Sequence, residues 1–193
     1  MTRIAVGPVF AMLVSPAVCQ VHGPKLMSAP SLPHYEWKAG PSECCSYGQW
    51  SARKQVVVYN TWKQDRRPIA EIAKGDTVLG VTGVIITLRP GVVRMDRDLP
   101  EDNLKRGDTI LTYGYGGEGF SAVWFNGRYY SDFDISFTRW PDGSGCGGAH
   151  CAATYVDLGK NVWRVQVKLK SGRTGWVDID NAGFDCKKAP DCG

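Results

Sequence analysis

Hydrophobic and polar residues alternate along much of this chain with a period of two, which is the spacing of β-strands that bury one face. The run VWRVQVKL at residues 162–169 is the clearest case, because arginine, glutamine and lysine alternate there with apolar residues. Runs rich in β-branched and aromatic residues predict further strands at residues 55–59, 77–81, 84–88, 109–115, 120–125, 128–133, 135–140 and 174–179. Residues 69–75 fit either a helical turn or a bend. The pattern predicts an all-β barrel or sandwich.

A repeat divides this array of strands. KGDTVL at residues 74–79 returns as RGDTIL at residues 106–111, an offset of 106 − 74 = 32 residues. In each copy a glycine-containing bend leads into the next strand. Asn126-Gly127 predicts a two-residue hairpin turn, because both residue types accept positive φ. We expect a second, partial unit at residues 104–140, inside a β-domain that spans residues 44–193.

The segment before this domain has the composition of a targeting signal followed by an arm. Residues 4–18 are mostly apolar, follow Arg3 and are too few to span a bilayer, so we predict a signal peptide at residues 1–19. Residues 20–43 are rich in proline and predict a flexible arm. Lipid attachment at Cys19 is less favoured, because Val18 stands where a small residue is required. We expect a periplasmic or secreted protein.

The cysteines fit an oxidising compartment. The chain has seven, and loss of Cys19 with the signal leaves 7 − 1 = 6. The six fall in three groups, which we expect to form disulfides: Cys44 and Cys45, Cys146 and Cys151, and Cys186 and Cys192. The middle pair can close a short glycine-rich loop. Adjacent cysteines rarely bond each other, so the first pair is expected to reach the last, with the connectivity left open.

Charge and motifs exclude several classes of protein. The net charge of +4 is small and dispersed, which argues against a nucleic-acid partner. Residues 114–119 match G-x-G-x-x-G, but a strand follows them instead of the helix that a dinucleotide site needs. A zinc site at Cys146, His150 and Cys151 would need reduced thiols. We expect no cofactor, no metal, no transmembrane span and a monomer.

Three segments carry a resemblance to a known family: VVY at residues 57–59, IAEIAKGD at 69–76, and WRVQV with SGRTGWV between 163 and 177. They resemble the bacterial SH3-like domain family, over residues 53–185. The resemblance implies one and a half to two interleaved small barrels. It also implies an exported binding or spacer module of the cell envelope, without catalysis of its own.

The aromatic residues supply the candidate binding surface. We expect five tryptophans to pack in the core or between barrels: Trp50, Trp62, Trp124, Trp163 and Trp176. Tyrosines beside the glycine-rich turn at residues 116–119 are candidates for a surface that contacts a peptide or a sugar. The candidate contact residues are Tyr113, Tyr115, Glu118 and Tyr129.

These observations favour an exported, non-enzymatic SH3-like module that binds a peptide, a glycan or a protein of the bacterial cell envelope. One alternative is a small secreted hydrolase that uses a cysteine or paired carboxylates. The other is an enzyme inhibitor that presents a disulfide-braced loop at residues 145–151.

Overall fold

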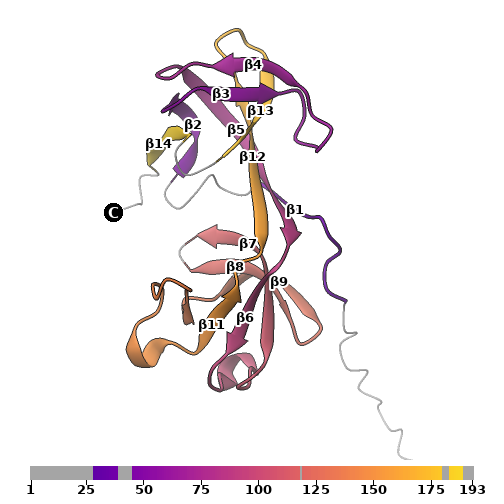
Figure 1. Ribbon diagram of the computed structural model, residues 1–193, viewed down its shortest axis with the longest axis vertical. Helices are drawn as coiled ribbons and strands as arrows, with labels where there is room; N and C mark the ends of the chain where they lie inside the picture. The colour runs from indigo at the N-terminus through magenta and orange to yellow at the C-terminus, as the bar shows by residue number, and fades with distance from the viewer. Residues whose placement is uncertain (1–27, 39–44, 118, 180–182, 189–193) are drawn as a thin grey trace, which may run out of the picture.

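Two β-sheets lie end to end along the long axis of the molecule (Figure 1). The computed structural model describes residues 28–38, 45–117, 119–179 and 183–188, and it describes only the backbone of Cys45 and of residues 186–188. The long strands β5 (Thr77–Arg89) and β12 (Lys160–Lys168) belong to the upper sheet of Figure 1 and extend down to the lower one. The predicted all-β fold is confirmed, as two curled half-barrel sheets.

The first sheet has the strand order β14-β2-β5-β12-β13-β3-β4, with β1 added alongside β5. Every pairing in it is antiparallel. Its strands are β1 (His34–Trp37), β2 (Cys45–Ala52), β3 (Val56–Tyr59), β4 (Pro68–Ile72), β5 (Thr77–Arg89), β12 (Lys160–Lys168), β13 (Thr174–Asp178) and β14 (Phe184–Lys188).

The second sheet, in order β10-β11-β6-β7-β8-β9, is built from the part of the chain between β5 and β12. Its strands are β6 (Gly91–Met95), β7 (Thr109–Gly117), β8 (Phe120–Phe125), β9 (Arg128–Asp134), β10 (Thr138–Arg139) and β11 (Ala153–Asp157). Two short 3-10 turns, η1 (Pro100–Asp102) and η2 (Gly148–His150), lie in its loops. The sequence that makes the second sheet is therefore inserted within the first.

The two copies of the GDT bend make the same pair of backbone hydrogen bonds. In the first copy Gly75 N donates to Ala52 O at 2.8 Å, and Ala52 N donates to Asp76 O at 2.9 Å. In the second copy Gly107 N donates to Met95 O, and Met95 N donates to Asp108 O, both at 2.9 Å. The two glycines have φ of 86° and 91°, the left-handed region that favours glycine. Each bend thus joins the end of one strand, β2 or β6, to the start of the next, β5 or β7.

Two predictions of local structure were wrong. The runs at residues 77–81 and 84–88 form one 13-residue strand, β5. Gly80, within this strand, leaves room for the indole of Trp50, whose Cζ2 would lie only 2.8 Å from an ideal Cβ at residue 80. The arm expected at residues 20–43 contains strand β1, which pairs with residues 84–87 of β5.

Each sheet has its own hydrophobic core. The core of the first is built around Trp50 and Val165, and that of the second around Met95 and Ile110. A third, smaller cluster of Val84, Ile86 and Trp176 lies on strands β5 and β13. In the described residues, no helix is long and apolar enough to cross a membrane.

Candidate functional site

Strand β1 holds the two sheets together because its alternate side chains face different partners. Tyr35 and Trp37 make edge-to-face contacts with Trp62, with ring centroids 5.1 and 5.0 Å apart. On the opposite face, His34 Nε2 lies 3.0 Å from the Tyr129 hydroxyl, which donates a 2.6 Å hydrogen bond to Glu36 Oε1. The alternation of a β-strand thus sends the odd residues to the first sheet and the even residues to the second.

The odd face of β1 continues as one surface across β5 and β12. In register, Tyr35 lies beside Ile86, and Ile86 lies beside Val162. Because neighbouring residues of paired strands point to the same side, these three side chains form a row across the sheet. The next row contains Trp37, Val84 and Arg164.

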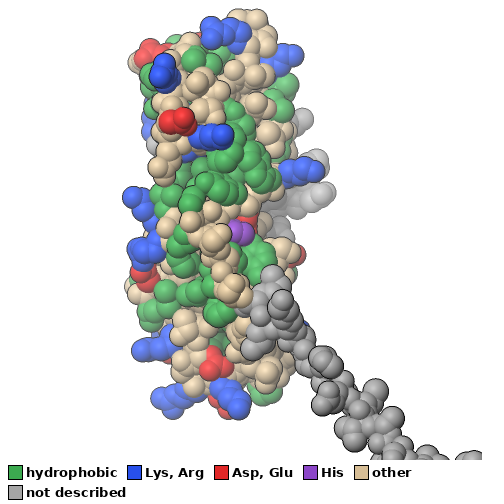
Figure 2. Space-filling model, turned by 90° about the vertical axis from the view of Figure 1, so that its right-hand side faces the viewer, with side chains coloured by type: hydrophobic (Ala, Val, Ile, Leu, Met, Phe, Trp, Pro, Cys, Tyr) green, Lys and Arg blue, Asp and Glu red, His purple; other side chains and the backbone are tan. Residues whose placement is uncertain are grey.

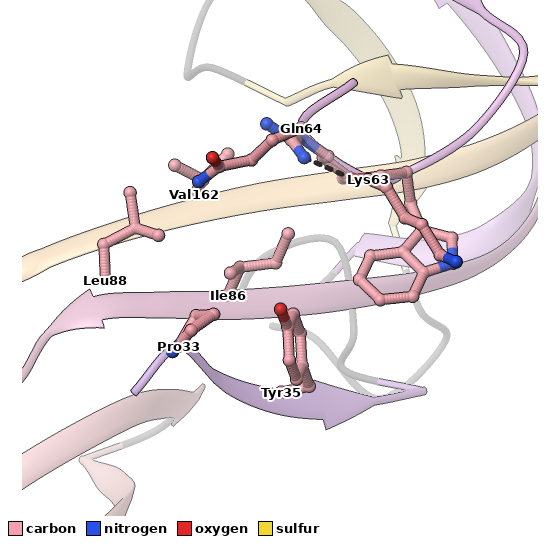
Figure 3. Close-up of a pocket in the computed structure, with 9 residues that line it drawn as sticks. Pro33, Tyr35, Lys63, Gln64, Ile86, Leu88 and Val162 are labelled. Atoms are coloured by element: carbon pink, nitrogen blue, oxygen red, sulfur yellow. Dashed lines mark hydrogen bonds between the residues drawn. The ribbon is translucent and has the colours of Figure 1, made fainter. Parts of the chain in front are cut away.

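The loop between β3 and β4 overhangs these rows and closes them into a groove of about 380 Å³, here called the strand-face groove. Figure 3 shows Tyr35, Ile86 and Val162 directed from their strands toward the loop residues Lys63 and Gln64. The groove is lined by Pro33, Tyr35, Trp62, Lys63, Gln64, Ile86, Leu88, Val162 and Arg164. Its walls are mainly apolar, and Lys63, Gln64 and Arg164 add polar groups.

Large aromatic side chains remain exposed beside this groove. Trp37 is 50% exposed and Tyr35 is 40% exposed, although residues of this size are usually covered. Figure 2 shows hydrophobic side chains gathered over the middle of this side of the molecule, with Lys and Arg side chains toward its edges. Exposed apolar surface beside a hollow is a common feature of binding sites in proteins.

A partly buried ion pair supports the loop. Arg164, 8% exposed, donates from Nε to Asp178 Oδ1 at 3.1 Å, and its Nη1 donates to the carbonyl of Trp62. Arg66 binds the same carboxylate through two hydrogen bonds of 2.6 Å. Burial alone would raise the pKa of Asp178, but the hydrogen bonds and charges of the two arginines outweigh it and hold that pKa below its usual range. The pair fixes the backbone that carries Trp62.

The polar cluster on the even face of β1 connects this strand to the second sheet. Burial, and then the hydrogen bond and charge of Glu36, raise the pKa of Tyr129, so its phenol keeps its proton at neutral pH. His34 and Tyr113 pack edge to face with a centroid distance of 5.2 Å, and Thr87 donates to the carbonyl of Tyr113. These contacts join β1 and β5 to β7 and β9. These polar and aromatic contacts therefore hold the two sheets together.

The predicted tyrosine surface is split by the structure. Tyr113 is 1% exposed and Tyr129 is half-buried, both against β1, so Tyr113 does not belong to an open surface. Tyr115 is 41% exposed and lies in a separate hollow with Trp140. The register of β7 against β8 shifts between Thr112 and Gly114, and such a shift changes the face that the following residues occupy. Glu118 lies outside the described residues.

The predicted Cys146–Cys151 disulfide is present, with Cα atoms 5.2 Å apart. Neither sulfur is a free thiolate, which removes the cysteine nucleophile at Cys151 and two ligands of the zinc site considered above. The backbone of Cys45 pairs with that of Lys188 in the β14–β2 ladder, so the two ends of the domain do meet. The sulfur partners of Cys44, Cys45, Cys186 and Cys192 lie outside the part that the structure describes.

Sequence reasoning missed Trp37 and gave Trp62 an incomplete role. Trp50 and Trp176 are buried as predicted, whereas Trp62 both packs against the cluster of Val84, Ile86 and Trp176 and lines the strand-face groove. The sequence signal for Trp37 was the alternation of HYEW at residues 34–37, within a proline-rich segment.

Within the described ranges no three His, Cys, Asp or Glu side chains gather as a metal site would require. Comparison of the chain with protein-family models, curated proteins and solved structures gave no match.

Proposed function

We propose that this chain is an exported, non-enzymatic SH3-like binding module of the bacterial cell envelope, and that the strand-face groove binds a polypeptide partner. The observation that carries the proposal is the exposed pair Tyr35 and Trp37 beside an apolar groove of about 380 Å³. Exposed aromatic side chains next to a preformed hollow are the usual anchors of protein recognition.

The size and the walls of the groove favour one or two apolar side chains as the inserted group. Ile86, Leu88 and Val162 form the base, and Trp62 forms the overhanging wall. The arginine–aspartate pair behind Trp62 makes this wall rigid, so little ordering is needed on binding.

The charges at the groove favour an acidic partner. Lys63 lines it, the charge of Arg164 is compensated by Asp178, and among the described residues that line the groove there is no Asp or Glu. An apolar side chain next to a carboxylate therefore complements the groove better than the same side chain next to a lysine.

The SH3-like and envelope parts of the proposal have separate support. Two similar bends lead into β5 and β7, and a GWV-containing hairpin, β12 with β13, lies in the middle of the first sheet. The apolar segment at residues 4–18 and the Cys146–Cys151 disulfide both suit export to an oxidising compartment.

The test is binding of defined, fluorescently labelled octapeptides to the oxidised mature protein, measured by anisotropy. The peptides hold a central Leu, Phe or Trp flanked by Asp and Glu, by Ser or by Lys. We expect the acidic-flanked peptides to bind tightest. Lys63→Glu should weaken the binding of these peptides by about tenfold, which corresponds to ~1.4 kcal/mol. Trp62→Ala should abolish their binding.

Lys74→Glu is the matched control, because Lys74 is an exposed lysine on the first GDT bend and does not line the groove. It should leave binding unchanged. Equal affinity for all flanking charges, or an equal loss with Lys63→Glu and Lys74→Glu, would show that the groove is not the recognition site.

A further inference from the structure

A second hollow lies in the second sheet, apart from the strand-face groove. It consists of two cavities of about 310 and 170 Å³ that share Tyr115 and Trp140. We call the two together the Tyr115–Trp140 cleft. The strand-face groove shares none of its lining residues with this cleft.

The lining of the cleft combines aromatic and apolar side chains with uncharged polar groups. The larger cavity has the hydroxyls of Ser136 and Thr138, and the smaller has Thr112, Ser121 and the amide of Asn161. Among the described residues that line either cavity there is no Asp, Glu, Lys or Arg. A charged ligand would lose its hydration there without gaining a counter-charge, so the cleft selects for neutral ligands.

One buried hydroxyl in this cleft has no partner. Thr138 is 1% exposed, lines the larger cavity, and its Oγ1 makes no hydrogen bond within the described part of the chain. A buried hydroxyl without a partner is costly and uncommon in folded proteins. A ligand that brings a hydroxyl or amide to this position would satisfy it.

Flat aromatic surfaces stand next to these hydroxyls. Trp140 and Tyr155 pack in a tilted arrangement, with ring centroids 4.7 Å apart and an interplanar angle of 32°, and Tyr115 is 41% exposed at the rim. Burial raises the pKa of Tyr155, which interacts with the hydroxyls of Thr112 and Ser121, so its phenol is a neutral hydrogen-bonding group. Aromatic rings together with neutral hydroxyl and amide groups match a sugar, whose ring has apolar C–H faces and hydroxyl edges.

The rim that carries Trp140 is preformed. Trp140 N donates to Ser144 O, and Gly143 N donates to Trp140 O, both at 2.9 Å. Gly145 has φ of 93°, and a Cβ there would lie 2.6 Å from both Trp140 Cδ1 and Thr138 O, so only glycine allows this close approach. The Cys146–Cys151 disulfide closes the next loop. The tryptophan is therefore held in place before any ligand arrives.

We propose that the Tyr115–Trp140 cleft binds a neutral saccharide, with Trp140 and Tyr115 contacting the sugar ring and Thr138 hydrogen bonding to it. This gives the protein a second binding site, which goes beyond the polypeptide groove and does not depend on it. No bond is made or broken in this step.

The test is an NMR titration of the oxidised mature protein with cellotetraose, maltotetraose and the tetramer of N-acetylglucosamine, with tetragalacturonate as the charged comparison. At least one neutral probe should shift the Trp140 indole and the amides of Tyr115 and Thr138. Thr138→Val keeps the shape of the side chain and removes its hydroxyl. It should weaken binding of that probe by about tenfold without lowering the unfolding temperature. Tyr115→Ala should also weaken it.

Two control variants distinguish saccharide binding in the cleft from polypeptide binding in the strand-face groove. Thr174→Val changes an exposed threonine of β13 and should leave saccharide binding unchanged, as should Trp62→Ala in the strand-face groove. Binding of no neutral probe at millimolar concentration, tighter binding of tetragalacturonate, or full affinity in Thr138→Val would each overturn the proposal. Shifts confined to the groove would overturn it while leaving the polypeptide site intact.

Discussion

The carboxylate of Glu36 lies against the backbone of Gly114, in the space that a Cβ at residue 114 would occupy. Glu36 belongs to β1 of the first sheet and Gly114 to β7 of the second. The absence of a side chain at residue 114 therefore lets β1 dock on the second sheet, where Glu36 accepts the hydrogen bond from Tyr129. One glycine makes room for the joint that also fixes Tyr35 and Trp37 beside the groove.

Substitution of this glycine should undock β1. Gly114→Ala forces the Glu36 carboxylate or β7 to move, and overpacking of this kind costs about 2 kcal/mol of unfolding free energy. Chemical denaturation followed by tryptophan fluorescence measures it. Gly147→Ala is the control, because nothing lies within 4 Å of a Cβ at that exposed glycine and its φ is not positive. An equal effect of both substitutions would contradict the role of Gly114.

Removal of the Tyr129 hydroxyl should weaken the same joint. In Tyr129→Phe the side chain of Glu36, 21% exposed, loses a charged hydrogen bond, which costs about 2 kcal/mol at neutral pH. Equilibrium unfolding of both proteins in urea at pH 7 measures the difference. A stability equal to that of the wild type would mean that water replaces the hydroxyl.

The same tyrosine should lower the free energy of unfolding at alkaline pH. Its pKa is raised in the folded protein, so above pH ~10, the ordinary value for tyrosine, the unfolded chain loses the phenol proton while the folded protein keeps it. Stability is therefore complete below pH 10 and falls as the pH rises, by at most ~1.4 kcal/mol per pH unit for this one proton. Tyr129→Phe should show a shallower fall. Tyr47, whose pKa burial raises to about 12, contributes part of the slope that remains.

The carboxylate of Asp178 should stabilise the loop that carries Trp62. Asp178→Asn leaves the nearly buried Arg164 without its charged partner. We expect a loss of about 2 kcal/mol, less than the ~3–5 kcal/mol of a fully buried pair, because the Asp178 side chain is 42% exposed. Since the pKa of Asp178 is lowered in the folded state, this stability is present above pH ~4, the ordinary value for aspartate, and is lost as the pH falls further.

A matched comparison is available at Asp185, which accepts a hydrogen bond from Arg53 on the exposed edge of the sheet. Asp185→Asn should leave stability unchanged, because water screens exposed ion pairs. Urea titrations of both variants between pH 2 and 7 distinguish the two sites. Equal losses would show that burial of Arg164 does not matter.

All six cysteines that follow the predicted signal peptide should be paired. Mass spectrometry after alkylation, before and after reduction, counts the free thiols of the exported protein. We expect none before reduction and six after it. A reactive thiol at Cys44 or Cys45 would revive the cysteine hydrolase and count against a purely binding function.

Much of the strand content was predictable because alternation and turn residues are local signals. The hairpin at Asn126-Gly127, with φ of 48° and 73°, and the GDT bends lie where the sequence places them. The separation of the tyrosines was not predictable from the sequence. Tyr113 and Tyr115 are two residues apart, and such residues share a face in any regular strand. A one-residue shift in register between β7 and β8 separates them, and that shift belongs to the pairing of two strands.

The all-β class, the repeated bend and the disulfide-closed loop can be derived from the sequence, because each depends on residues close together in the chain. The positions of the two proposed binding surfaces depend on the tertiary structure. The strand-face groove joins Tyr35, Trp62, Ile86 and Val162, which lie in four separate segments, and the Tyr115–Trp140 cleft joins β7 to the loop after β10. The local pattern says which face of a strand is apolar, whereas strand pairing decides which faces meet and which remain open.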